Sequence, residues 1–370
     1  MWSGRTWAFL ALLVSIGPLE AEVVTSISDC AQFFLEETPP HIPGILEDGN
    51  ILDQNRYKPI CQTYKSERRF VTLYDISNKI PVFSAYKYIG NRTGRPKQNW
   101  QIEPQLEDEM TDESNAVYMN QAGNNDYKNQ LDLDRGHLFP SSHAFTTDDK
   151  KSTFILTNIV PQAGSFNKNS WSKMESCVKC VLEKYCINTN ARHEGFVVTG
   201  AQPSTNNFLN NKINIPSMLW SAFCCYSSSL NRWIASAHWG DNVPDEHTNK
   251  YLTTRTLEEL HQTLSRFNPG FEVFPQTRCP LHTTVAEFYS AINEENNKCD
   301  CLPTASTTSA PSTTTSALLS TTASTTSAPS TTTSTTTTTT TSPTKKPRKN
   351  KMDTKTKKGG ALRIASAVFA

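Results

Sequence analysis

Short apolar segments separated by Gly, Pro and Asn recur through the middle of this 370-residue chain. Segments rich in β-branched and aromatic residues and bounded by turn residues are typical of β-strands. The predicted strands are RFVTLYDI, PVFSAYKYIG, TFILTNIV, GFVVTGA, SMLWSAFCCYS and RWIASAHWG, with a shorter strand in LDLDRGHLFP. The pattern therefore predicts a sheet built from several short strands.

Helical periodicity begins after Asn169, where residues recur along one face at steps of three and four. The residues of this face are Trp171, Met174, Glu175, Val178, Val181, Leu182 and Tyr185. A second helix is predicted over residues 256–267. Strands mixed with a few helices, without an internal repeat, predict an α+β fold with a mixed, mainly antiparallel sheet and flanking helices.

The two ends of the chain differ in composition from the middle. Arg5 and the apolar run WAFLALLVSIG, followed by Ala21, predict a signal peptide over residues 1–21 and a secreted, extracellular protein. Residues 303–343 repeat Ser, Thr and Pro and predict a disordered, mucin-like stalk, and residues 344–370 predict a disordered basic tail. The final ALRIASAVFA is too short for a transmembrane helix. One folded domain is expected over residues 22–302.

Net charge is divided unevenly between the body and the tail. The whole chain carries +1, but residues 303–370 hold nine Lys or Arg against Asp353 alone, a net charge of +8. Because Arg5 and Glu20 cancel, residues 22–302 carry a net charge of −7. A polyanion would therefore have to bind the body at a local basic patch, whereas the tail could bind nucleic acid or other anionic polymers through charge alone.

All ten cysteines lie beyond the predicted signal peptide. An even number of cysteines in a secreted chain predicts disulfides, whose pairing the sequence does not determine. A zinc site at Cys177, Cys180 and Cys186 is the alternative, although no fourth ligand stands at the spacing of a zinc finger or ribbon. The sequence contains one N-glycosylation sequon, at Asn91, which predicts a surface loop.

The stretch LDLDRGHLFPSS places acids, an arginine and a histidine in an apolar frame. A second predicted strand, in STFILTNIV, and the predicted helix follow it, which gives the order β, β, α. Asn158 falls at the end of that strand, Asn167 in the loop before the helix, and Glu175 on the helix. Polar side chains thus gather where the three elements are expected to meet.

These residue types suit the hydrolysis of a phosphodiester. His137 titrates near neutral pH and can serve as the base that deprotonates water. The amide oxygen of Asn167 can hold Mg²⁺ with most of its hydration shell intact, and Glu175 can orient metal-bound waters. Arg135 can contact a phosphate oxygen bidentately, and Gly136 would let the backbone pass close to substrate.

The same residues resemble the secreted DNA/RNA non-specific endonucleases, whose ββα-metal core carries a DRGH motif. Asp134, Arg135, Gly136 and His137 stand at the motif, and TNIVPQAGSFNKNSWSKME supplies the downstream asparagines and the glutamate. The resemblance covers roughly residues 60–280.

The resemblance implies a role for each matching residue. His137 would be the general base, Asn167 the direct ligand of Mg²⁺, and Glu175 a holder of metal-bound water. Asn158 would position the catalytic histidine, and Arg135 would contact phosphate. Asp134 would anchor the loop, and Mn²⁺ or another divalent ion is the alternative to Mg²⁺. The family also implies a further substrate-binding arginine upstream, with four candidates: Arg68, Arg69, Arg92 and Arg95.

Each residue also has a structural interpretation. His137 could be a hydrogen-bonded core histidine, Arg135 could pair with Asp132 or Asp134, and the two asparagines could be turn or cap residues. Four other histidines lack a comparable setting and receive no function: His143, His193, His238 and His261.

The sequence therefore predicts a secreted, Mg²⁺-dependent endonuclease that cleaves DNA and RNA with little sequence specificity, and the family resemblance implies 5′-phosphorylated products. One alternative is a catalytically inactive binding or adhesion glycoprotein on the same fold. The other is a phosphodiesterase for small nucleotides, which would need an enclosed pocket in place of an open groove.

Overall fold

The computed structural model describes residues 22–107, 118–128, 130, 132–247, 250–288, 299 and 301. These residues all belong to one unit, Met1–Ala310, and a second unit spans Pro311–Ala370. The predicted signal peptide, stalk and basic tail lie outside the described residues.

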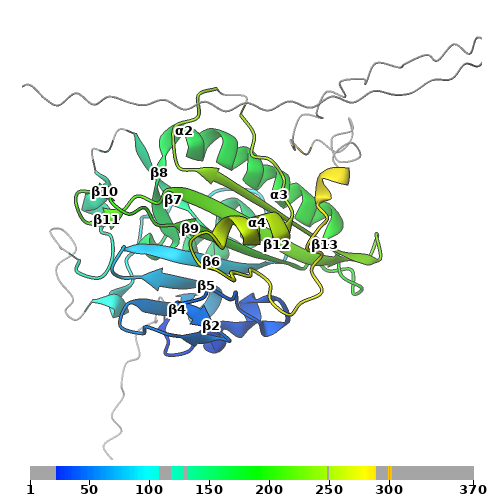
Figure 1. The fold of residues 1–370 in the computed structure, drawn as a ribbon, viewed down its shortest axis with the longest axis horizontal. Helices are drawn as coiled ribbons and strands as arrows, with labels where there is room; N and C mark the ends of the chain where they lie inside the picture. The colour runs from blue at the N-terminus through cyan, green and yellow to red at the C-terminus, as the bar shows by residue number, and fades with distance from the viewer. Residues whose placement is uncertain are drawn as a thin grey trace, which may run out of the picture. The chain divides into compact units, whose positions relative to one another are not determined.

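Seven strands form the main sheet, in the order β1-β4-β5-β6-β9-β12-β13 (Figure 1). Every neighbouring pair is antiparallel. The strands are β1 (Glu22–Val23), β4 (Tyr57–Tyr64), β5 (Glu67–Asp75), β6 (Ile80–Tyr88), β9 (Gly195–Gln202), β12 (Met218–Ser227) and β13 (Arg232–Asp241). The predicted α+β class with a mainly antiparallel sheet is confirmed, and β4 is a strand that the sequence pattern did not predict.

Hydrophobic cores lie on both faces of this sheet, because successive side chains of a strand point to opposite faces. In β6, Phe83 and Ala85 pack in one core, while Tyr86 and Tyr88 pack in the other. The core around Tyr86 also contains residues of a two-stranded hairpin, β7 (Leu133–His137) and β8 (Ile159–Ala163), and of helix α3 (Ser172–Tyr185). This arrangement places the predicted site on one face of the sheet.

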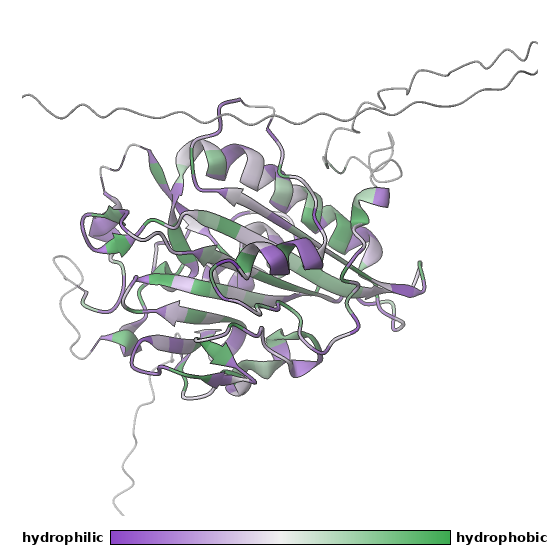
Figure 2. Cartoon of the chain, viewed as in Figure 1, coloured by the Kyte–Doolittle hydropathy of each residue, from purple (hydrophilic) through white to green (hydrophobic). Residues whose placement is uncertain are grey.

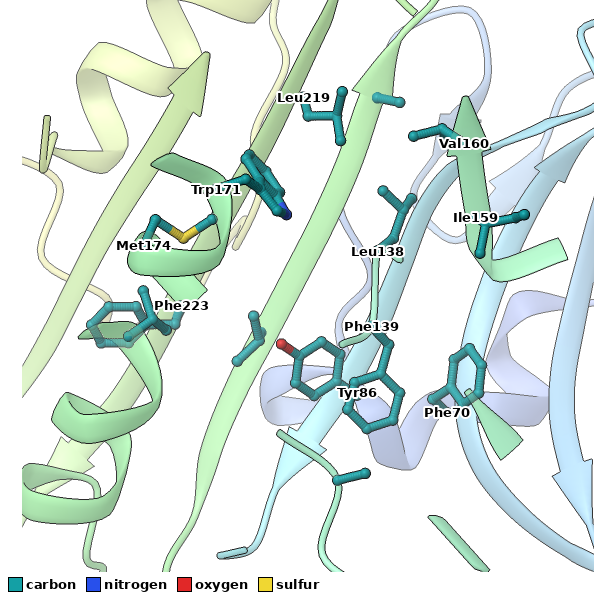
Figure 3. Close-up of a cluster of buried hydrophobic side chains, with 14 of the residues drawn as sticks. Phe70, Tyr86, Leu138, Phe139, Ile159, Val160, Trp171, Met174, Leu219 and Phe223 are labelled. Carbon is teal, nitrogen blue, oxygen red and sulfur yellow. The ribbon is translucent and has the colours of Figure 1, made fainter. Parts of the chain in front are cut away.

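Leu138 and Phe139, the residues directly after the DRGH motif, enter this core (Figure 3). The Phe139 ring stacks on Tyr86 with 3.9 Å between centroids and meets Phe70 edge to face. The other core contains the apolar side of α4 (Leu257–Leu264), whose opposite side carries hydrophilic residues (Figure 2). α4 confirms the helix predicted over residues 256–267, with Thr256 as its N-cap.

Two predicted boundaries near the site are wrong. TFILTNIV does not form one strand, since Leu156–Asn158 is a 3₁₀ turn and β8 begins at Ile159. The helix does not begin near Asn169, because helical structure starts with α2 (Gly164–Phe166) and continues through a π-helical turn (Asn167–Trp171) into α3. Asn167 therefore lies within helical structure and not in a preceding loop.

Shorter elements complete the described part of the chain. They are η1 (Ile27–Phe33), η2 (Leu35–Glu37), β2 (Leu46–Glu47), β3 (Asn50–Ile51), η3 (Pro104–Leu106), η4 (Asn124–Tyr127), η5 (Ser141–His143), α1 (Thr147–Ser152), β10 (Phe208–Leu209), β11 (Ile213–Asn214) and η8 (Val285–Phe288).

All ten cysteines are paired. The disulfides are Cys30–Cys61, Cys177–Cys301, Cys180–Cys299, Cys186–Cys225 and Cys224–Cys279. The predicted disulfide framework is confirmed, and the zinc alternative is wrong because each of its three cysteines is oxidised. Within the described residues, no helix has the length and apolar character needed to cross a membrane.

Candidate active site

Arg135 and His137 project from the same face of β7, because they lie two residues apart on a strand. β7 pairs with β8 from Leu133 opposite Ala163 to His137 opposite Ile159. The indole of Trp100 lies against both side chains, 5.0 Å from the His137 ring centroid and 5.7 Å from the guanidinium carbon of Arg135. The hairpin thus presents an imidazole and a guanidinium side by side.

Aromatic rings enclose the His137 imidazole. Besides Trp100, Phe154 lies edge to face at 5.2 Å, and Nε2 is buried with no hydrogen-bond partner among the described residues. Burial, together with the positive charge of Arg95, lowers the pKa of His137 to about 3. The ring is therefore neutral near neutral pH, and because Nε2 is buried, Nδ1 is the nitrogen left for a water molecule.

Arg135 forms no ion pair with Asp132 or Asp134 in the described structure. One Nη donates a hydrogen bond to the Asn124 carbonyl at 3.1 Å, and the guanidinium lies over the ring of Tyr127 at 5.1 Å as well as over Trp100. Burial lowers the pKa of Arg135 from its ordinary value. A cation held by rings and a carbonyl, without a carboxylate, keeps its charge available to an anionic ligand.

Asp134 joins β7 to the helical turn that carries Asn167. Its carboxylate accepts a hydrogen bond from the Asn167 amide nitrogen at 3.0 Å and forms an ion pair with Lys168 at 2.7 Å. This contact uses the donor end of the Asn167 amide and leaves its oxygen as the acceptor. The buried carboxylate of Asp245 holds the same turn through the backbone and hydroxyl of Ser170, both at 3.0 Å.

Asn158 is fully buried and makes hydrogen bonds at both ends of its amide. The oxygen accepts from the Ser84 hydroxyl at 2.9 Å and from the Phe139 backbone N–H at 3.0 Å. The nitrogen donates to the carbonyls of Phe139 and Thr153, both at 3.0 Å. Asn158 therefore fixes the backbone two residues beyond His137 and has no hydrogen-bonding capacity left for substrate.

Glu175 lies in the first turn of α3. Burial raises the pKa of its carboxyl to about 8, and the Trp171 indole and the positive charge of Arg95 oppose that rise. No described residue forms an ion pair with this carboxylate. A buried carboxylate without a cationic contact is costly to ionise, so a hydrated cation would stabilise its charged form.

His143, to which the sequence assigned no function, connects the sheet to this glutamate. Its Nε2 bonds to the Glu175 backbone carbonyl at 2.9 Å, and its Nδ1 bonds to the Tyr86 hydroxyl at 2.8 Å. A carbonyl only accepts, so Nε2 carries the proton and Nδ1 accepts from Tyr86. Burial lowers the pKa of His143 to about 4, which keeps this tautomer neutral. No local sequence signal indicates the link, because Tyr86 lies 57 residues away.

Arg95 is the candidate among the four upstream arginines that lies at the site. Its charge acts on both His137 and Glu175, and its guanidinium carbon lies 5.2 Å from the Phe154 ring centroid. The other three are engaged elsewhere: Arg68 pairs with Glu22, Arg69 pairs with Asp149, and Arg92 lies over Phe145.

The structure gives a packing reason for glycine at position 136, which differs from the close approach of substrate that the sequence suggested. A Cβ atom at this position would lie 2.1 Å from the Gln162 amide oxygen and 2.6 Å from the Gln162 Cβ. Gln162 is fully buried on β8 and crosses the space that a side chain would need. Glycine at this position therefore allows the two strands of the hairpin to pack.

A hollow of about 440 Å³ opens beside Arg135 and Trp100. Its other lining residues come from two stretches, residues 98–102 and 118–128. Asn91, the sequon asparagine, lies in the loop that follows β6 and accepts a hydrogen bond from the buried Lys150 at 2.9 Å. Its glycosylation stays a prediction.

The donor set at this site is small. Among the described residues, no group of three or more His, Cys, Asp or Glu side chains could hold a metal ion. The Asn167 amide oxygen and the Glu175 carboxylate are hard oxygen donors, and Mg²⁺ commonly takes one or two protein oxygens and keeps several waters. The residues present therefore fit a hydrated Mg²⁺ and do not fit a metal that needs a cage of protein ligands.

The predicted residues are thus joined by two kinds of contact. Asp134 connects the motif strand directly to Asn167, and Arg95 lies close enough to His137 and Glu175 to affect both pKa values. Asn158 and Asp134 hold the backbone, whereas Arg135 and the acceptor end of Asn167 remain available for ligands.

Comparison with known proteins identifies a family. The family model for the DNA/RNA non-specific endonuclease matches residues 49–278. The chain is 30% identical over 241 residues to human endonuclease domain-containing 1 protein, covering 61% of this chain and 45% of that protein. It is 34% identical over 89 residues to a nuclease of Nostoc sp., covering 24% of this chain and 30% of the relative.

A solved structure of the EndoG/EndoGI complex contains a chain that aligns with a TM-score of 0.42 and 19% identity, over 60% of this chain and 92% of that one. The chain spans about half the length of the endonuclease domain-containing 1 protein that it matches. Since the family model covers most of the sheet, the hairpin and the helix that form the site, the chain belongs to the DNA/RNA non-specific endonuclease family.

Proposed function

We propose that this protein is a secreted endonuclease that hydrolyses the phosphodiester bonds of DNA and RNA with the help of Mg²⁺. One observation carries the proposal. The charge of Arg95 acts on both His137 of the motif strand and Glu175 of the helix, so a base, a cation and a metal-holding carboxylate converge. Metal-assisted hydrolysis of a phosphodiester can use all three.

His137 accepts the proton of the attacking water at Nδ1. The lowered pKa keeps the imidazole neutral across the physiological range, and the negative charge of a phosphate beside it would raise that pKa toward the value that a general base needs. The rings of Trp100 and Phe154 hold the imidazole in one orientation. Asn158 supports this geometry by fixing the Phe139 backbone, two residues beyond His137.

Asn167 would hold Mg²⁺ through its amide oxygen, and Glu175 would hold the metal-bound waters. When bound, Mg²⁺ supplies stabilisation of the charge that develops on the phosphate and on the leaving 3′-oxygen, which leaves the 5′-phosphate on the product. Asp134 orients the amide through its bond to the Asn167 nitrogen. Mn²⁺ or another divalent ion with oxygen preference would suit the same donors.

Arg135 and Arg95 contact the phosphates on either side of the attacked bond. Neither forms an ion pair with a described residue, so their charge is available in a body whose net charge is −7. Contacts to phosphate position a substrate but carry no sequence information, which suits an enzyme that accepts both sugars and many sequences.

Secretion is part of the proposal and is supported by the leader sequence and by the five disulfides, which persist in oxidising compartments. A glycan on Asn91 and O-glycosylation of the Ser/Thr/Pro-rich stalk, residues 303–343, belong to the same proposal.

The test is digestion of plasmid DNA and of a long RNA by the secreted protein, with Mg²⁺ or with EDTA. His137→Ala and Asn167→Ala should each lower the cleavage rate by at least about 10²-fold, the range expected for loss of acid–base or electrostatic stabilisation. His282→Ala, at an exposed histidine away from the site, is the matched control and should cut as the wild type does.

Cleavage that survives EDTA or the loss of His137 would refute the mechanism. If the folded wild type cuts neither polymer with any divalent ion, the chain is an inactive binding glycoprotein on the nuclease fold. Turnover confined to small nucleotides would instead identify a phosphodiesterase.

A further inference from the structure

The hollow beside Arg135 is lined largely by amide side chains. Five of them face it: Gln98, Asn99, Gln101, Asn124 and Asn125. An amide offers both a donor and an acceptor, the combination that pairs with the edge of a nucleobase. Three of the five, Gln98, Asn99 and Asn125, make no side-chain hydrogen bond to another described residue, so they are available to a ligand, whereas Gln101 and Asn124 donate to backbone carbonyls.

The charge of this hollow is opposite to that of the body. Its lining includes Arg135 and Lys128, and no Asp or Glu is among the described residues that line it. Lys128 is exposed and forms no ion pair with a described residue. A protein body with a net charge of −7 therefore has a hollow with two cations and no carboxylate, which favours an anionic ligand with a hydrogen-bonding edge.

The hollow adjoins the base that the proposed reaction uses. Trp100 lines it, and the same indole lies 5.0 Å from the His137 ring centroid. Arg135, also in the lining, stands two residues from His137 on one face of β7, roughly 7 Å along the strand. A nucleotide in the hollow would thus be the immediate neighbour of the phosphate that His137 serves.

We propose that this hollow is a subsite for a purine nucleotide next to the scissile phosphate. Arg135 and Lys128 hold its phosphate, and Gln98 and Asn125 contact the edge of its base. A purine is favoured because its N7 accepts from an amide N–H while the neighbouring exocyclic group of adenine donates to the amide oxygen. The enzyme then has a base preference at one position flanking the cut. The inference rests on the proposed nuclease function.

The experiment has two readouts that fail independently. In the first, random-sequence single-stranded DNA is digested with Mg²⁺ and the fragment ends are sequenced. The wild type should show a purine at one flanking position about fivefold or more above a pyrimidine, the factor expected of one good base contact. In the second, binding of AMP and of UMP is measured by calorimetry in EDTA, where no cleavage occurs.

Gln98→Ala and Asn125→Ala should bring the ratio of purine to pyrimidine at that position close to one. They should also weaken AMP binding until its affinity approaches that of UMP. Gln262→Ala removes an exposed amide from α4, whose apolar side packs in the other core, and should change neither readout. Lys128→Gln should weaken the binding of AMP and of UMP equally. Lys58→Gln removes the same charge elsewhere and should leave both affinities unchanged.

Cleavage without a positional preference, or a preference that both amide variants retain, overturns the subsite and leaves the nuclease proposal intact. A wild type that selects AMP over UMP through Asn125 but cuts nothing supports the subsite and refutes the nuclease function. Equal binding of AMP and UMP in the wild type overturns the subsite whether or not the protein cuts.

Discussion

At the scale of single residues, the site separates side chains that hold the backbone from side chains that remain free for chemistry. Asn158 satisfies both ends of its amide inside the core, whereas the His137 Nε2 and the Arg135 Nε are buried without a hydrogen-bond partner among the described residues. Unsatisfied buried polar atoms are costly and concentrate at functional sites. Within the DRGH motif, Arg135 and His137 are the two residues with such an atom.

Gly136→Ala should lower the free energy of unfolding by about 1–3 kcal/mol, the usual cost of overpacking, because the new methyl group would overlap Gln162. Gln162→Ala removes the overlap with the amide group but keeps the Gln162 Cβ at 2.6 Å, so the double variant should lose less than the sum of the two single losses without recovering the wild-type stability. Denaturant unfolding of the four proteins measures the cycle. Additive losses would mean that Gln162 is not what constrains this glycine.

Glu103 should make stability depend on pH. It is fully buried, and burial raises the pKa of its carboxyl to about 7 although it accepts a hydrogen bond from the Gln105 N–H. The folded state then binds this proton more tightly than the unfolded state. The contribution is therefore complete below the ordinary pKa near 4.5 and is lost as pH rises toward 7.

Glu103→Gln keeps the acceptor and removes the titration. Between pH 5 and pH 7.5, the wild type should lose roughly 1–3 kcal/mol of unfolding free energy relative to this variant. The two proteins share the buried His143 and His238, whose lowered pKa values make stability rise with pH, so the comparison cancels that contribution. Parallel stability curves for the two proteins would contradict the assignment.

At the scale of elements, the position of α3 relative to the sheet determines where Glu175 lies. The Tyr86 hydroxyl of β6 donates to His143, and His143 donates to the Glu175 carbonyl, so a hydrogen-bonded chain runs from the sheet to the helix. The π-helical turn at Asn167–Trp171 joins the hairpin to α3, and such turns are frequent at functional sites because they redirect a helix locally.

Tyr86→Phe should cost about 1–3 kcal/mol of unfolding free energy, because it leaves the buried His143 Nδ1 without a donor. It should also lower kcat more than it raises KM, since the helix that carries Glu175 loses one of its fixed contacts. Tyr226→Phe, which removes an exposed hydroxyl bond to Asn231, serves as the control. Unchanged kcat in a folded Tyr86→Phe protein would show that these hydrogen bonds have no role in positioning Glu175.

Local patterns predicted most strands of the main sheet but not how the elements meet. Strands such as β12 and β13 are apolar over most of their length, so composition alone identified them. The segment before β8 contains the same residue types, but Leu156–Asn158 forms a 3₁₀ turn. The buried Asn158 at the end of this turn is held by a hydrogen bond from Ser84 of β6, which the local sequence does not reveal. The motif residues could be named from sequence, whereas Arg95 could be chosen only after the loop following β6 was seen packed on Phe154.

At the scale of the whole molecule, two disulfides fasten one short segment to one helix. Cys177 and Cys180 of α3 are bonded to Cys301 and Cys299, so the two bonds close nearly the same large loop, with separations of 124 and 119 residues. Loop-closure entropy depends on the chain length that a bond newly restricts. Once either bond has formed, the other restricts only a few more residues.

The two bonds should therefore stabilise the fold in a non-additive way. Replacing either pair with Ser, as Cys177→Ser with Cys301→Ser or Cys180→Ser with Cys299→Ser, should cost less than about 2 kcal/mol of unfolding free energy. Replacing both pairs should cost about 3–4 kcal/mol, because Cys186–Cys225 and Cys224–Cys279 already shorten the loop that these bonds newly close. Thermal unfolding of the three variants tests this, and equal costs for the two single replacements that sum to the double cost would contradict it.

The same pair of bonds determines how a mechanical load would enter the protein. Cys299 and Cys301 are the last described residues before the Ser/Thr/Pro-rich stretch, and each is covalently attached to α3. Tension applied through residues 302–370 would therefore pass into the helix through two covalent bonds. A body tethered through that stretch would keep its fold under a pull that non-covalent attachment would not resist, with the load applied within two residues of Glu175.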